Sequence, residues 1–244
     1  MGKRPDAVSV IFEDDELLVL EKPSGWVVND ASTVGDTPVV QRWLSDNYSH
    51  ETIGEKVFRC GIVHRLDKDT SGVLITAKKK AAFRALQNQF KQRSVSKTYK
   101  ALVHGKVEPL TGSVKAPVGR LPWNRERFGV LPGGRAAETK YSVVAHYGKS
   151  DEKSYYSLLD VFPITGRTHQ IRIHMKYLKH PVVSDVFYAG RKRSRSDLKW
   201  CPRLFLHAAK IEFLHPKTKR KVEFVSPLPQ ELEDVIDGLE SLDS

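Results

Sequence analysis

Residues 61–78 read GIVHRLDKDTSGVLITAK, and this stretch places charged residues between two apolar runs. The apolar runs are residues 62–63 and 73–75. The polar residues between them are His64, Arg65, Asp67, Lys68 and Asp69. Because an unpaired charge is costly to bury, these side chains either come to the surface in a loop or belong to a reactive site.

The chain around this stretch alternates between strand and helix patterns. Residues 72–78 and 97–105 are β-rich and predict strands, and residues 79–93 between them predict a helix with one apolar side. Three hairpins are expected, pairing 8–12 with 17–22, 139–147 with 154–162, and 204–214 with 221–227. Further helices are expected after an N-cap at Thr37-Pro38, from 165 to about 178, and over 229–242.

Strands outnumber helices in this pattern, and the chain has no internal repeat and no low-complexity linker. The order of elements predicts an α+β fold with a mixed, largely antiparallel sheet and flanking helices. A chain of 244 residues is within the range of one large domain, so a single domain over residues 1–244 is expected.

The composition favours an anionic partner and a reducing compartment. The formal net charge is +11, which makes nucleic acid the first candidate partner. Two cysteines are too few for a disulfide scaffold or a cysteine-based zinc site. No signal peptide or membrane span is evident, and no nucleotide-binding glycine motif occurs, so we expect a cytoplasmic monomer without metal or cofactor.

Asp67 and Asp69 allow one reading as a phosphatase. A DxDxT run after an apolar strand is typical of phosphatases that use the first aspartate as nucleophile and the second as acid or base. The residues before Asp67 are His64, Arg65 and Leu66, which do not resemble a buried strand. This activity therefore stays as an alternative.

Three longer segments point elsewhere. They are HRLDKDTSGVLI (64–75), KTYKALVHG (97–105) and TGRTHQIRIH (165–174), supported by EDDELLVLEKPSGWVV (13–28) and HPVVSDVFYAG (180–190). Together they strongly resemble the RluA-type pseudouridine synthases of RNA, over nearly the whole chain. The resemblance implies the fold of that family with a central catalytic cleft, and isomerisation of uridines in ribosomal or transfer RNA.

The resemblance also implies the roles of three residues. Asp67 matches the catalytic aspartate, and Arg172 matches the arginine that pairs with it. Tyr99 matches the tyrosine whose ring stacks on the flipped base, with its hydroxyl near C5. A base inside a helix must leave the stack to be reached. The reaction is redox-neutral, so it needs no nicotinamide or flavin.

Further residues are expected to contact RNA. Arg65 is implied to fill the gap left by the flipped base, and Asp69 is expected to stabilise a turn. The other expected RNA contacts are His64, Arg167, His169 and Arg120. The basic runs 191–195 and 217–221 are expected to be solvated loops or phosphate contacts, with nothing to decide between them.

Two departures from the family pattern bear on substrate choice. The family often places a small S4 RNA-binding domain before the catalytic domain, and a first hairpin at about residue 8 leads us to expect that it is absent. Ser184 stands where glycine is expected, and a basic loop over 191–200 follows it. An RNA-binding protein without catalysis is a third reading, but the intact set of Asp67, Tyr99 and Arg172 argues against it.

Overall fold

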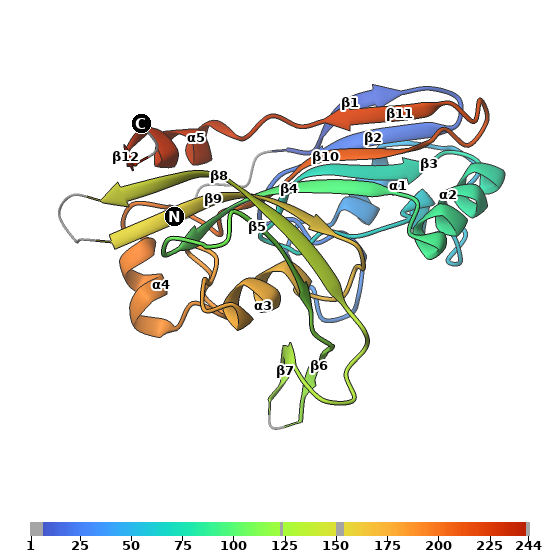
Figure 1. Ribbon diagram of the computed structural model, residues 1–244. Coiled ribbons are helices and arrows are strands. Elements are labelled where there is room, and N and C mark those ends of the chain that lie inside the picture. The colour runs from blue at the N-terminus through green and yellow to red at the C-terminus, as the bar shows by residue number, and fades with distance from the viewer. Residues whose placement is uncertain (1–6, 123, 150–153, 243–244) are drawn as a thin grey trace. The chain divides into compact units, whose positions relative to one another are not determined.

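In the computed structural model, residues 7–122, 124–149 and 154–242 are described (Figure 1). They divide into two compact units. Unit 1 comprises the described parts of Met1–Lys97 and Ala208–Pro227, and unit 2 those of Thr98–His207 and Leu228–Ser244. The expectation of a single domain stays a prediction.

The sheet of unit 1 begins with the strands β1 (Ser9–Glu13), β2 (Leu17–Lys22) and β3 (Ser71–Ala77), each antiparallel to the next. Strand β10 (Leu206–Leu214) follows β3 in the order, and β11 (Lys221–Val225) pairs antiparallel with β10. The carboxylate of Asp14 accepts the N–H groups of Glu16 and Leu17, both at 2.8 Å, and so closes the β1–β2 turn. The first and third predicted hairpins are confirmed.

The helical elements of unit 1 are α1 (Val40–Asn47), the short 3₁₀ turn η1 (Arg59–Gly61) and α2 (Lys80–Gln92). On α2, Phe83 and Leu86 are buried and Phe90 is partly buried, against apolar residues of β3 and β10. The helix predicted over 79–93 is therefore confirmed with its apolar side.

The predicted start of α1 is wrong. The helix begins at Val40, and its N-cap is Val39 in an extended conformation, without a side-chain cap. The cause is a contact earlier in the chain. Val27 donates its N–H to the carbonyl of Pro38 at 3.0 Å and forms a parallel bridge with Val39. This contact keeps Pro38 and Val39 extended.

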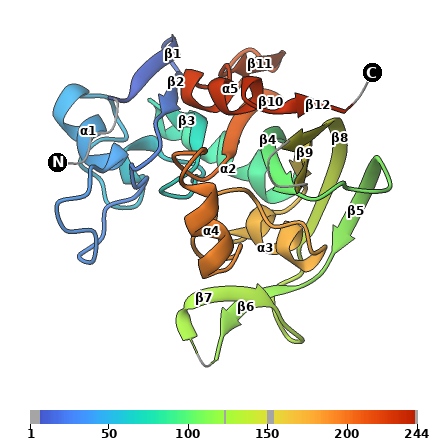
Figure 2. The ribbon, with the colours of Figure 1, turned by 90° about the vertical axis from the view of Figure 1, so that its left-hand side faces the viewer.

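In unit 2 the strand order is β4 (Ser96–His104), β9 (Ser154–Pro163), β8 (Glu138–Lys149) and β12 (Glu240–Ser241). Strand β5 (Thr111–Lys115) also pairs with β8, and these pairings are antiparallel. The predicted β8–β9 hairpin is confirmed. A separate hairpin, β6 (Val118–Leu121) with β7 (Asn124–Val130), extends away from the sheet of unit 2 (Figures 1 and 2).

The helices of unit 2 are α3 (Gln170–Tyr177), α4 (Arg191–Asp197) and α5 (Gln230–Asp237). Helix α5 buries Leu232 and Val235, as its apolar stripe predicts. The loop expected over 191–200 is wrong, because most of that segment is helix α4. In the described part of the chain, no helix is both long and apolar enough to cross a membrane. The predicted α+β class with a largely antiparallel sheet is confirmed.

Candidate active site

Asp67 lies in a loop of unit 1 that leads directly into β3. Its side chain is partly buried, and its carbonyl accepts the N–H of Thr70 at 3.2 Å, which closes a turn. The carbonyl of Lys68 accepts the N–H of Gly25 at 2.8 Å, and the carbonyl of Asp69 accepts the hydroxyl of Ser24 at 3.0 Å. The segment after β2 therefore fixes the backbone of the Asp67 loop.

Lys22 strengthens this attachment from the end of β2. Its side chain is fully buried, and its ammonium donates to the carbonyls of Pro23 at 2.8 Å, Trp26 at 2.9 Å and Lys68 at 3.1 Å. An ammonium has three N–H donors, so three carbonyls suit it. Sequence reasoning missed this residue, although Lys22 shares the strand face of the buried Leu18 and Leu20.

Gly72, at the end of the motif, is required by a close approach of chains. Its φ is +115°, and a Cβ atom there would lie 2.3 Å from the carbonyl oxygen of Ala208 in β10. No side chain fits at that distance. The glycine therefore lets β3 and β10 come together immediately after the Asp67 loop.

His64 joins the loop to its neighbours within unit 1. Its Nε2 accepts the N–H of Ile75 at 2.9 Å, and its ring stacks on Phe90 with centroids 4.9 Å apart. Burial, and then the positive charge of Lys97, lower the pKa of His64 to about 3. The ring is therefore neutral at pH 7 and lacks the charge that a phosphate contact uses. The contact of His64 with RNA stays a prediction.

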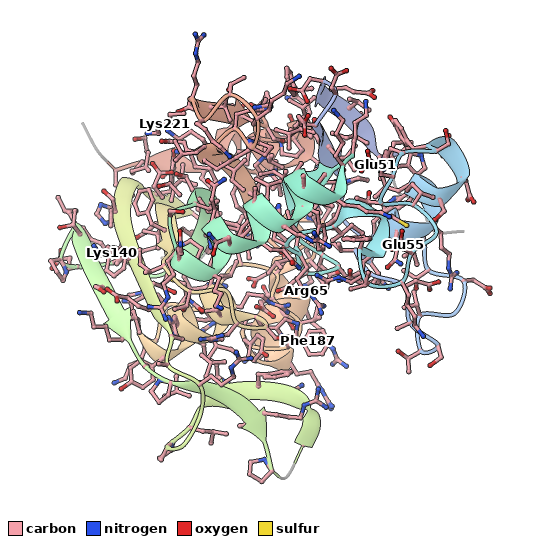
Figure 3. The ribbon with its side chains drawn as sticks, turned by 90° about the vertical axis from the view of Figure 1, so that its right-hand side faces the viewer. Glu51, Glu55, Arg65, Lys140, Phe187 and Lys221 are labelled. Atoms are coloured by element: carbon pink, nitrogen blue, oxygen red, sulfur yellow. The ribbon has the colours of Figure 1, made fainter. Side chains whose placement is uncertain are left out.

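Arg65 differs from its neighbours in exposure. Its side chain is exposed, and Figure 3 labels it. Leu66, the next residue, is buried, and Asp67 is again partly exposed. This alternation is that of an extended segment, in which Arg65 and Asp67, two residues apart, lie on one face.

Tyr99 and Arg172 both lie in unit 2. Tyr99 is in β4, opposite Val161 of β9, and its partly buried ring packs against the core of unit 2. Arg172 is in α3 and is 2% exposed. Its Nε and Nη2 each donate to a carboxylate oxygen of Asp185 at 2.8 Å. Two parallel bonds of this kind fix the plane of a guanidinium.

Asp185 organises more than this pair. Its Oδ1 also accepts the N–H groups of Phe187 at 2.9 Å and Tyr188 at 3.0 Å. The rings of the same two residues lie 5.4 and 5.1 Å from the guanidinium carbon of Arg172; Phe187 is labelled in Figure 3. Asp185 lies within the segment HPVVSDVFYAG, but the sequence assigns it no role. Its role comes from its pairing with the buried Arg172, which the sequence alone does not show.

The remaining predicted RNA contacts also lie in unit 2. His169 is the N-cap residue of α3 with a φ of +55°, and its Nδ1 lies 2.8 Å from the hydroxyl of Tyr188. Arg167 donates its Nε–H to the carbonyl of Ala136 at 3.2 Å. Arg120 is exposed on β6.

A series of ring contacts connects Arg120 and His169 to the aromatic group around Arg172. The guanidinium carbon of Arg120 lies 5.1 Å from the ring centroid of Phe128, and Phe128 meets the ring of His169 edge-on. Tyr188 contacts both His169 and Arg172. Within unit 2 the structure thus brings Arg172, His169 and Arg120 into one chain of contacts. Asp67 belongs to unit 1, and its pairing with Arg172 stays a prediction.

Comparisons with known proteins identify the family. The family model described as RNA pseudouridylate synthase matches residues 16–177. An uncharacterized RNA pseudouridine synthase of Chloroflexus aurantiacus is 43% identical over 219 residues, which cover 90% of this chain and 65% of that protein. The ribosomal large subunit pseudouridine synthase C of Vibrio vulnificus is 37% identical over 233 residues, covering 94% and 69%.

A solved structure agrees with these sequence matches. The human RNA pseudouridylate synthase domain containing 1 is 26% identical with a TM-score of 0.74, covering 96% of this chain and 89% of that one. The chain spans about two thirds of the length of the two curated relatives, 65% and 69%. With a family match over more than half of its length, the chain belongs to the RNA pseudouridine synthase family.

Proposed function

We propose that this protein isomerises uridines in RNA to pseudouridine, with Asp67 as the catalytic carboxylate. The observation that carries the proposal is the family match over residues 16–177, which includes Asp67, Tyr99 and Arg172. The backbone attachment of the Asp67 loop adds support, because a catalytic group needs a fixed position.

The reaction balances within the substrate. The N1–C1′ bond breaks, the base turns, and a C5–C1′ bond forms. C5 then loses its proton, and N1 carries one in the product. The uridine must leave the base stack for this to happen.

Arg172 and Tyr99 complete the proposed site. A guanidinium next to a carboxylate favours the ionised form, which desolvation in a closed site opposes. Asp185 holds Arg172 in one orientation before substrate binds. We propose that the ring of Tyr99 stacks on the flipped base and that its phenol oxygen accepts the C5 proton.

The substrate class is proposed as ribosomal or transfer RNA. The ribosomal relatives favour the first of these, and the net charge of +11 suits either. We propose that the enzyme acts as a cytoplasmic monomer without metal or cofactor. Its two cysteines, Cys60 and Cys201, are free and buried, which suits a reducing compartment.

The phosphatase alternative gains no support from the fold. In such an enzyme the nucleophilic aspartate follows a buried strand. Here Asp67 precedes strand β3, and the residues directly before it form a loop. No described contact favours Asp69 as an acid or base.

The two activities are separated by one assay. Ribosomal and transfer RNA transcripts are made with tritium at C5 of uridine and incubated with the protein in excess EDTA. We expect tritium release and a matching yield of pseudouridine in at least one RNA. Absence of release from every transcript, together with magnesium-dependent hydrolysis of an aryl phosphate, would overturn the proposal.

A further inference from the structure

Helix α4 carries a dense group of cations on its exposed side. The exposed cations are Arg191, Lys192, Arg193 and Arg195, with Lys199 just after the helix. In the described residues, none of these five side chains forms an ion pair. The group is therefore a set of solvated positive charges on one short helix.

This arrangement does not serve the stability of the helix. Three of the cations stand in its first turn, where the helix dipole disfavours positive charge. Arg191 and Arg195 are four residues apart, a spacing at which like charges repel. The N-cap, Gly190, contributes no side-chain bond. Another part of the helix must hold it in place.

The buried side of α4 supplies that hold. Asp197 is 2% exposed, and its Oδ2 accepts the Nε2–H of His104 at 2.9 Å and the N–H of Ser184 at 3.0 Å. The hydroxyl of Ser184 donates to the carbonyl of Cys201 at 2.7 Å. Ser184 directly precedes Asp185, the partner of Arg172. The helix is thus fastened beside the residue that orients the proposed site arginine.

One of these contacts also accounts for serine in place of glycine at 184. The φ of Ser184 is +57°, a left-handed conformation that favours glycine. The hydroxyl bond of Ser184 to the carbonyl of Cys201, which glycine lacks, offsets this strain. The unusual serine therefore belongs to the attachment of α4.

The other basic run is built differently. Lys221 forms an ion pair with Glu212, and the ammonium of Lys219 donates to the carbonyl of Pro216. Part of the charge of 217–221 is therefore used within unit 1. The cations of 191–195 therefore differ from those of 217–221 in having no ion-pair partner among the described residues, a difference that the sequence alone does not show.

We propose that α4 binds the phosphate backbone of the RNA substrate, which rests on the proposed function. Arginine and lysine are the side chains that bind phosphates, and unpaired cations are available for it. Figures 1 and 2 show α4 beside α3, the helix that carries Arg172. Phosphate contacts there fix the RNA relative to that arginine, and the attachment through Asp197 makes the contact rigid.

The test compares two variants that each lose four positive charges. One replaces Arg191, Lys192, Arg193 and Arg195 with Gln, which preserves helix propensity. The matched control replaces Lys217, Lys219, Arg220 and Lys221 with Gln. Binding of a fluorescein-labelled transfer RNA transcript is titrated at several salt concentrations, and circular dichroism confirms that each variant folds.

We expect the α4 variant to reduce the slope of log K against log salt by about 3, since it loses four cations and each phosphate contact contributes roughly 0.7 to 0.9. The control should change the slope by less than about 1. Single-turnover release of tritium at saturating RNA should stay near the wild-type rate in the control variant. Equal slope changes in the two variants, or none in the α4 variant, would overturn the proposal.

A second pair of variants tests the attachment. Asp197→Ala removes a negative charge, so on net charge alone it should strengthen RNA binding. We expect at least about threefold weaker binding, with partial recovery in Asp197→Asn. Stronger binding by a folded Asp197→Ala protein would contradict the attachment. If wild-type protein releases no tritium while the α4 slope change persists, the proposed function fails and the RNA-binding surface stands.

Discussion

Among the described residues, each unit buries one lysine or arginine almost completely, and the two cations are held by different groups. In unit 1, the ammonium of Lys22 donates to three main-chain carbonyls from separate positions, one of them in the Asp67 loop. In unit 2, the guanidinium of Arg172 binds both oxygens of the Asp185 carboxylate. Carbonyl ligands fix the path of a backbone, and a bidentate carboxylate fixes the plane of a side chain.

The difference matches the proposed roles of the two places. Asp67 is carried by a loop, so its position depends on where the backbone runs, and Lys22 ties that backbone to the end of β2. Arg172 is carried by a helix, which already fixes its backbone. Its long side chain still needs orientation, and Asp185 with two aromatic rings provides it. The comparison predicts unequal consequences when each arrangement is broken.

The largest effect on stability is expected from Asp185→Ala. The change leaves Arg172 buried without this carboxylate, which lowers the free energy of unfolding by about 3 to 5 kcal/mol. Chemical denaturation measures the loss. The matched control is Glu231→Ala, which removes the more exposed partner of Arg203 and should cost about 0 to 1 kcal/mol. Equal losses of unfolding free energy in the two variants would contradict a larger contribution from the buried Arg172–Asp185 pair.

A smaller loss is expected from Lys22→Met. This change removes the buried charge together with its hydrogen bonds, so it leaves no unpaired charge buried. Three carbonyls lose a donor, so the free energy of unfolding falls by about 1 to 3 kcal/mol. We also expect at least a roughly tenfold slower single-turnover rate with unchanged RNA affinity, since the Asp67 loop loses the hydrogen bond from Lys22 to the carbonyl of Lys68. Lys78→Met, which breaks an ion pair with Glu13, is the control and should keep the rate. An unchanged single-turnover rate in Lys22→Met would show that Lys22 does not position the Asp67 loop for catalysis.

The smallest effect concerns His64 and pH. The pKa of His64 is lowered to about 3, below its ordinary 6.5, so the unfolded chain binds a proton at pH 5 that the folded chain does not. This contribution to stability is present above pH 6.5 and is lost as the pH falls toward 3. Partial exposure of the ring reduces the effect. Between pH 7 and 5 we expect the unfolding free energy of the wild-type protein to fall by about 1 kcal/mol more than that of His64→Gln. Parallel pH profiles of the two proteins would contradict the burial of a neutral ring.

The elements that sequence predicted well are those with a clear period of their own. The hairpins alternate with period two, and α2 and α5 carry apolar stripes at helical spacing. Helix α4 has no such stripe, because its residues are mainly arginine, lysine and serine. Its buried side is attached through Asp197, which bonds to His104 and Ser184, and contacts with residues outside the helix leave no local pattern in the sequence.

The candidate site divides in the same way. The candidate residues Asp67, Tyr99 and Arg172 could be predicted from the sequence, because each lies in a contiguous segment that resembles a family motif. Lys22 and Asp185 could not, since each acquires its role from a partner far along the chain. His64 joins the loop to β3 and α2, a structural role that its motif does not show, and its contact with RNA stays a prediction.

The central claim is that Asp67 performs the chemistry, and a pair of matched substitutions tests it most directly. Asp67→Asn and Asp69→Asn each remove one negative charge from the same loop, two residues apart. Tritium release from C5-labelled RNA is measured in single turnover, with RNA affinity measured alongside. We predict no detectable release by Asp67→Asn with RNA binding retained, and most of the wild-type rate in Asp69→Asn. Loss of activity in Asp69→Asn with activity retained in Asp67→Asn would contradict the account.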